Sequence, residues 1–152
     1  MSTWVLRKDF EETFLELNNK GKSIWVINKV NRLPIEIYEI ALRLADLDFI
    51  KYIRICDETI AASSDNYPKR PKIPITKLEH ETAIGVQLLY SSTHKYINFF
   101  EINSPIKGNG SKMVDAILKG LPNDWQPALI MDWSGGFWDK MKDKYSELNW
   151  MC

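Results

Sequence analysis

The sequence predicts an α/β (α+β) fold in which a mixed, mostly antiparallel sheet is flanked by helices. Short runs rich in isoleucine, valine and aromatic residues suit pleated strands, and turn residues separate these runs. Other stretches repeat apolar residues at the 3.6-residue spacing of an amphipathic helix. The chain has 152 residues, of which 45% are hydrophobic and 26% charged. This length and composition predict a single domain, residues 1–152, with its own core.

The first half of the chain predicts two helices and a β-hairpin. Phe10, Phe14 and Leu17 recur at helical spacing, and Asn18-Asn19-Lys20-Gly21 is a stop signal. Pro34 suits the first position of a second helix. In order, we expect a strand at 4–6, the first helix, a strand or extended connection at 24–30, the second helix with apolar residues from 37 to 47, and a hairpin at 49–62 that turns at Asp57-Glu58.

Residues 63–77 have a different composition. Three prolines spaced by three residues alternate with basic residues, and proline removes backbone donors. We expect a loop or an extended, polyproline-like arm. A solvated hairpin loop and a lid or docking peptide are both compatible with this composition.

The second half predicts a hairpin followed by a crossover. Strands at 82–90 and 97–102 flank a short turn, with Gly85 as a bulge or a point of close approach. A helix at 111–121 then leads to a strand at 128–131, and such a crossover joins parallel strands. Phe137, Met141 and Tyr145, four residues apart, predict a last helix, and Leu148 to Met151 an edge strand.

The stretch from Ile97 to Leu118 has the strongest chemical pattern in the chain. It reads as a buried strand, a polar turn containing Gly108 and Gly110, and a helix. The first amides of a helix have no internal partner, and glycine lets a ligand approach the backbone closely. The pattern therefore favours a phosphate seat, although a plain connection that needed a positive φ would look the same.

The same stretch resembles the GCN5-related N-acetyltransferase superfamily. That family places an Arg/Gln-x-x-Gly-x-Gly/Ala loop between a strand and a helix, where here Pro105-Ile106-Lys107-Gly108-Asn109-Gly110 stands. A further strand and a helix opening in Phe-Tyr follow in the family, and here Phe137-Trp138 opens the last helix. The resemblance covers about residues 82 to 151.

The resemblance implies an acetyl-CoA-dependent N-acetyltransferase that modifies an amine of a small molecule or a protein. It implies Glu101 as the general base, and Tyr145, Tyr90 or Ser134 as the acid, although the thiolate can also leave without one. No metal is expected. Acetyl-CoA would be held by Ile102, Asn103, Lys107, Gly108, Asn109, Gly110 and Ser111. Pro105 and Trp138 replace a basic residue and a tyrosine of the family pattern. These replacements favour the alternative, a catalytically inactive domain of the same fold used for protein interaction or ligand sensing.

Charge and motif content argue against several other classes. The formal net charge is zero, so a general nucleic-acid binder is not expected. His80 and His94 lack the spacing of zinc ligands. Asp132 follows the glycine turn as a ribose-binding acid would, but Met113 stands where a dinucleotide site needs a third glycine. No apolar run approaches a membrane span, and we expect a cytoplasmic protein without a signal peptide.

Overall fold

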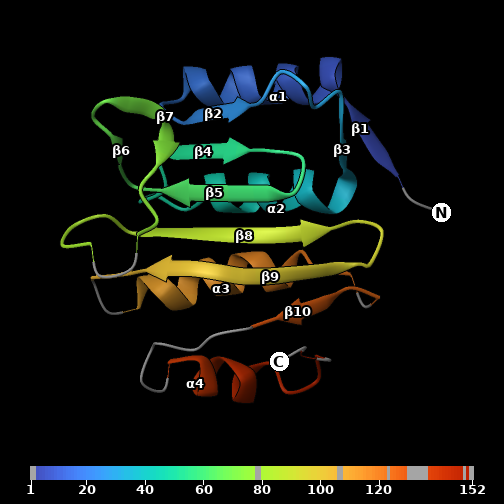
Figure 1. Ribbon diagram of the computed structural model, residues 1–152, viewed down its shortest axis with the longest axis vertical. Helices are drawn as coiled ribbons and strands as arrows, with labels where there is room; N and C mark the ends of the chain where they lie inside the picture. Colours follow the sequence, from blue (N-terminus) through green and yellow to red (C-terminus); the bar gives the residue numbers. More distant parts are fainter. Residues whose placement is uncertain are drawn as a thin grey trace.

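A six-stranded mixed sheet carries four helices in the described part of the chain (Figure 1). The computed structural model describes residues 3–77, 80–105, 108–122, 124–129, 137–148 and 150. The elements are β1 (Trp4–Leu6), α1 (Arg7–Asn19), β2 (Ser23–Val26), β3 (Arg32–Pro34), α2 (Ile35–Ala45), β4 (Tyr52–Ile55), β5 (Thr59–Ser63), β6 (Asn66–Tyr67), β7 (Arg70–Pro74), β8 (Gly85–Ser91), β9 (Tyr96–Asn103), α3 (Asn109–Lys119), β10 (Gln126–Ala128) and α4 (Phe137–Lys144).

The main sheet has the strand order β10-β9-β8-β5-β4-β2. Its centre is antiparallel, from β4 through β5 and β8 to β9, as the two predicted hairpins require. Both outer pairs are parallel, and each is joined by a helical crossover, through α2 between β2 and β4 and through α3 between β9 and β10. The second crossover was predicted. The first exists because β2 pairs with β4, where the sequence left a strand or an extended connection open.

One face of the sheet is apolar and is covered by helices. Figure 1 shows α1, α2 and α3 behind the sheet. Side chains alternate between the two faces of a strand, so this face receives every second residue of each strand. Its members include Ile24, Ile53, Ile55, Ile60, Val86, Leu88, Ile97 and Phe99, all of them buried in a core cluster shared with the helices.

The predicted arm at residues 63–77 is a short hairpin, β6–β7, that lies over the other face of the sheet. Strand β7 contacts β4 and β5. Gly85 permits this close approach, because a Cβ there would lie 2.5 Å from the backbone oxygen of Ile75. Of the two expectations for Gly85, close approach is therefore correct. Of the alternatives for this segment, the hairpin loop is therefore correct and the polyproline-like arm is not, since Asn66 and Tyr67 pair with Pro74 and Arg70.

Several predicted boundaries need correction. Pro34 is the residue before α2 and ends β3, because its ψ of 139° is extended and not helical. Strand β10 begins earlier than expected and ends at Ala128, while residues 130–136 lie outside the described part. Leu148 and Trp150 are not in a strand, and their neighbours Asn149 and Met151 are not described. Among the described residues, no helix has the length and apolar character needed to cross a membrane.

Candidate functional site

In the described part of the chain, the carboxyl-terminal half of β9 is paired on one edge and not on the other. Only its first three residues pair with β10, and the last of these pairs joins Asn98 to Ala128. The other edge of β9 continues to pair with β8 as far as Asn103. Among the described residues, the outer edge from Phe99 to Asn103 therefore has no strand partner. Its backbone amides and carbonyls are available to an extended ligand, as in peptide recognition by strand addition.

A β-bulge interrupts β9 within this open segment. Gln87 pairs with Glu101 and Leu88 pairs with Phe99, so Phe100 is the extra residue on β9. The sequence predicted Phe100 within a largely buried strand, and the strand is correct, but the side chain of Phe100 is 57% exposed at the bulge. The bulge also directs Glu101 to the face opposite the helices. Bulges occur frequently beside active sites, where they aim one side chain.

The turn after β9 gives its two glycines different roles. Gly108 has a φ of +96°, which favours glycine, and a Cβ built there would meet no atom of the described residues within 4 Å. Its carbonyl accepts a hydrogen bond from the amide of Lys112, and this bond closes the first turn of α3. Among the described residues, no carbonyl outside the helix accepts from the amides of Asn109, Gly110 or Ser111. The surroundings of these amides fit an anion seat at a helix N-terminus.

Gly110 is buried and touches protein. A Cβ there would lie 3.2 Å from Cε1 and 3.3 Å from Cζ of Phe137, the first residue of α4. The small size of Gly110 thus allows α4 to pack against the start of α3. Beside it, the buried Trp138 lies with its ring centroid 4.8 Å from that of Phe99 on β9. The aromatic residues that open the last helix contribute to the core at this position.

Two further residues expected to bind the cofactor, Ile102 and Asn103, have different surroundings. Ile102 lies on the helix-covered face and packs against the core. The side chain of Asn103 is buried and donates from Nδ2 to the carbonyls of His80 (2.9 Å) and Ala83 (2.6 Å). Only the backbone of Asn103 is therefore available to a ligand. Lys107 lies outside the described residues, as does Asp132.

Glu101 lines a cavity of about 170 Å³ between the sheet and the β6–β7 arm. Thr76, which follows the arm, donates from Oγ1 to Oε2 of Glu101 at 2.9 Å. The same hydroxyl lies 3.4 Å from Oε1 of Gln87, the partner of Glu101 across the sheet. Glu101 is thus held at the wall of a small polar cavity. A carboxylate in this position can accept a proton from a ligand that occupies the cavity.

Arg54 lines the same cavity and was not predicted as a site residue. Its Nε is buried and has no hydrogen-bond partner among the described residues. The guanidinium lies over the ring of Trp25, 5.2 Å from its centroid. In the sequence, Arg54 alternates with isoleucines in a short strand. This alternation predicts that the arginine lies on the face of the sheet opposite the isoleucines, but it does not predict which residues the arginine contacts. The contact between Thr76 and Glu101 joins residues 25 apart and left no local signal.

Tyr145, the other predicted catalytic residue, is not brought together with Glu101. Its hydroxyl donates to Oδ1 of Asp115 on α3 at 2.6 Å, and Lys144 donates to the same carboxylate. Burial would raise the pKa of Asp115, but the hydrogen bonds from Tyr145 and Lys144 outweigh it and hold the pKa below its ordinary value. Burial and the bond to Asp115 raise the pKa of Tyr145. The tyrosine does not line the Glu101 cavity.

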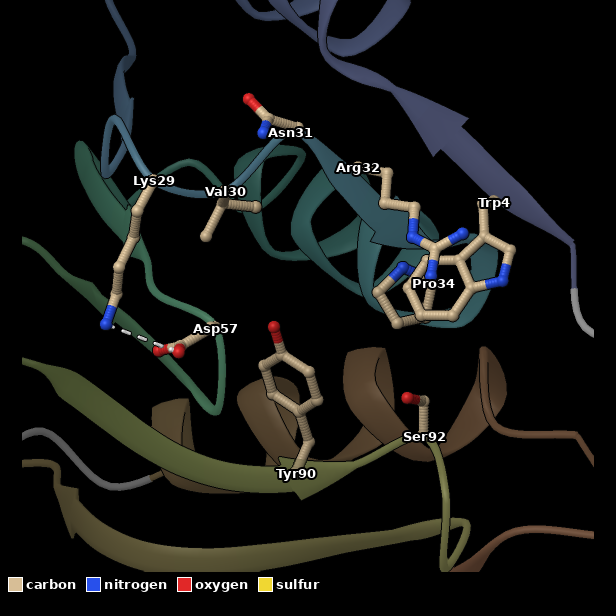
Figure 2. Close-up of a pocket in the computed structure, with 9 residues that line it drawn as sticks. All are labelled: Trp4, Lys29, Val30, Asn31, Arg32, Pro34, Asp57, Tyr90 and Ser92. Carbon is tan, nitrogen blue, oxygen red and sulfur yellow. Dashed lines mark ion pairs between the residues drawn. The ribbon is translucent and has the colours of Figure 1, made fainter.

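A second cavity lies where β4 turns into β5 and β8 ends (Figure 2). Its charged groups already have partners: Lys29 pairs with Asp57 at 3.4 Å, and Arg32 lies 4.0 Å from the ring centroid of Trp4. The hydroxyl of Tyr90 donates to the carbonyl of Cys56 at 2.7 Å, and burial raises the pKa of this tyrosine. The first cavity is the stronger candidate site, because it contains Glu101 and because, among the described residues, the buried Nε of Arg54 has no hydrogen-bond partner.

The comparisons with known proteins do not add to this geometry. No family model, no curated protein and no solved structure matches the chain. Among the described residues, no group of three or more histidine, cysteine or acidic side chains is placed to hold a metal ion. The candidate site therefore depends on the open edge of β9, the start of α3 and the cavity lined by Glu101.

Proposed function

We propose that the chain is an acetyl-CoA-dependent N-acetyltransferase with a GCN5-related fold. The observation that carries the proposal is the continuity of three features along one strand. Among the described residues, the outer edge of β9 has no strand partner from Phe99 to Asn103, Glu101 lies within that segment, and the chain leads through Gly108 into α3. Acetyl-CoA has the matching order of groups, which are a thioester, two amides and a diphosphate.

Each part of the cofactor finds a chemical counterpart. The pantetheine amides resemble a peptide backbone and would pair with the outer edge of β9 between Phe99 and Asn103. The diphosphate would accept hydrogen bonds from the amides at the start of α3, where the helix dipole also favours negative charge. Gly108 keeps this approach open, because no side chain projects from it.

Glu101 would act as the general base. An ammonium group cannot attack a thioester, so its proton must first pass to a carboxylate, directly or through a water. The free amine then attacks the carbonyl carbon, and the tetrahedral intermediate collapses as the C–S bond breaks, while the second proton of the attacking nitrogen passes to water or to the departing thiolate. The electron pair of that bond leaves with the thiolate. Because the hydroxyl of Tyr145 is bound to Asp115, the proposed mechanism uses Glu101 alone and lets the thiolate leave without a protein acid.

A catalytically inactive domain of the same fold is the second candidate. Phe137 favours it, because its ring occupies the space beside Gly110 that a diphosphate would otherwise approach. Trp138 favours it too, since an indole N–H does not protonate a thiolate as a phenol can. Such a domain would bind a protein or sense a ligand without transferring an acetyl group.

Ligand-dependent melting temperature separates the two candidates. At a concentration of 100 times its Kd, acetyl-CoA should raise the free energy of unfolding by about 2.7 kcal/mol. For a domain of this size the melting temperature should then rise by roughly 5–10 °C. S-acetylpantetheine, which lacks the diphosphate, should give a much smaller shift at the same concentration. No shift at millimolar acetyl-CoA would defeat the enzyme proposal.

Turnover tests the assignment of the base. The Glu101→Gln variant should lose about 100-fold or more in kcat, measured as thiol release with a panel of diamines, amino acids and lysine peptides. Its shift in melting temperature with acetyl-CoA should stay at the wild-type value, because the diphosphate seat is unchanged. Glu81→Gln, which removes an exposed carboxylate, is the matched control. Equal activity of Glu101→Gln and Glu81→Gln would show that Glu101 is not the base.

A further inference from the structure

Arg54 and Glu101 lie in one row across the sheet. Arg54 pairs with Ala61, Ala61 pairs with Gln87, and Gln87 pairs with Glu101. The row crosses four neighbouring strands, so the Cα atoms of Arg54 and Glu101 are three strand spacings apart, about 14 Å. All four residues line the cavity beneath the arm. A cation and a carboxylate thus stand at the two ends of a single row.

The middle of the row leaves room between the two charges. Ala61 has only a methyl group, and Gln87 beside it is neutral. The cavity of about 170 Å³ is smaller than the roughly 300–1,000 Å³ typical of pockets for drug-sized ligands. Since each water in the liquid occupies about 30 Å³, the space corresponds to only a few water molecules. A small metabolite fits this volume better than a peptide does.

The charges at the two ends differ in their present partners. Among the described residues, Arg54 has no hydrogen bond to its buried Nε and no carboxylate within 4 Å. A guanidinium stays charged and matches a carboxylate with two parallel hydrogen bonds. Glu101 receives one hydrogen bond, from Thr76, and can accept others. The cavity therefore offers a donor fork at one end and free acceptor capacity at the other.

We propose that this cavity binds a small molecule that carries both an amine and a carboxylate. The carboxylate binds Arg54, and the ammonium group binds Glu101. The assignment of this molecule as the acetyl acceptor rests on the proposed function. It predicts that the acceptor is an amino-acid-like amine. Glu101 then holds the ammonium group before taking its proton. As a statement about binding, it holds without acetyl-CoA.

A series of straight-chain amino acids tests the proposal in the full chain without cofactor. The probes have one to five methylenes between ammonium and carboxylate, and alkylamines and alkanoates of the same lengths serve as half-probes. The readout is the NMR signal of the Nε–Hε group of Arg54, which changes when a carboxylate binds it. One or two chain lengths should bind about tenfold or more tightly than either half-probe, the size expected for a charged hydrogen bond.

Variants assign each end of the row. Arg54→Gln should remove the preference for the amino acid over the alkylamine, and Glu101→Gln the preference over the alkanoate. Arg54→Lys keeps the charge without the fork and covers the case in which Arg54→Gln does not fold. Arg70→Gln removes an exposed arginine of the arm that does not line the cavity, and should behave as wild type. For these affinities the readout is the amide signal of Gln87.

The outcomes separate this proposal from the proposed function. If amino acids bind through Arg54 but are not acetylated, the binding site is supported and the proposed enzyme activity is contradicted. Acetyl transfer to alkylamines with the same kcat/KM as to amino acids would keep the enzyme and overturn the zwitterion site. The site is also overturned if no probe moves the Arg54 signal, or if amino acids and half-probes bind equally.

Discussion

Replacing Gly85 by alanine should loosen the arm that covers the candidate site. The new Cβ would lie 2.5 Å from the backbone oxygen of Ile75 and 3.0 Å from that of Ala62. Carbon and oxygen atoms approach to about 3.3 Å at closest, so the chain at Ile75 must retreat by about 0.8 Å. Because these neighbours are backbone atoms, no rotation of a side chain can relieve the contact.

The same displacement should break the contact between the arm and Glu101. Thr76 follows Ile75, and its hydroxyl lies 2.9 Å from the carboxylate of Glu101. A retreat of about 0.8 Å would bring this distance to about 3.7 Å, beyond hydrogen-bond range. Overpacking of this kind costs about 1–3 kcal/mol, and the lower entropy of the unfolded alanine chain offsets part of it. We expect a net loss of about 1–2 kcal/mol.

Thermal unfolding followed by circular dichroism measures this loss. In a domain of this size, the melting temperature of Gly85→Ala should fall by about 2–8 °C. The control is Gly120→Ala, whose Cβ would meet the flexible end of the Arg43 side chain at 3.0 Å and would lie in ordinary contact, at 3.7 Å, with the backbone oxygen of Ile117. Gly120 has an ordinary φ of −88°. If Gly85→Ala has the same melting temperature as Gly120→Ala and the wild type, the arm does not lie against the sheet as described.

Four other substitutions test the site and its neighbours. Gly108→Ala places a side chain at a φ of +96° and should lower stability by about 1 kcal/mol in urea titration, while weakening the thermal shift with acetyl-CoA. The pKa of Asp115 in the folded protein is below its ordinary 3.8, so the ionised carboxylate stabilises the folded state. This stabilisation is complete well above pH 3.8 and is lost as the pH falls below that value. Asp115→Asn should therefore remove this part of the fall in melting temperature at acid pH. Tyr145→Phe should raise the pKa of Asp115, measured by NMR, and leave kcat unchanged. Trp138→Ala should cost about 3–5 kcal/mol in urea titration, because its side chain is only 3% exposed, and a loss under 1 kcal/mol would contradict its place in the core.

Local patterns were sufficient to predict most elements of the fold. The spacing of apolar residues predicts the helices α1, α2 and α3, and the turn residues predict both central hairpins. The crossover through α3 follows from the order strand, helix, strand. The pairing of β2 with β4 could not be predicted, because the sequence of a four-residue strand such as Ser23–Val26 does not indicate which strand pairs with it.

The candidate site was predicted in part. Glu101 and the glycine turn lie within one continuous stretch, where their types and spacing are visible together. Arg54 and Thr76 reach the same cavity only through the strand register and the fold-back of the arm, which join distant parts of the chain. The packing of Phe137 on Gly110 was hidden for the same reason. Glycine in a turn shows that space is needed, and only the fold shows whether protein or ligand uses that space.

The bulge at Phe100 has a consequence for how this cavity could evolve or be engineered. Side chains alternate with a period of two along a strand, so one inserted residue exchanges inside for outside beyond it. The bulge absorbs Phe100, because Leu88 pairs with Phe99 and Gln87 with Glu101, so Glu101 keeps the cavity side and Ile102 the helix side. A regular strand that retained Phe100 would instead turn Glu101 toward the helices and bring Ile102 to the cavity wall. Deleting Phe100 should therefore leave the pocket acidic, whereas straightening the bulge around it would make the pocket apolar.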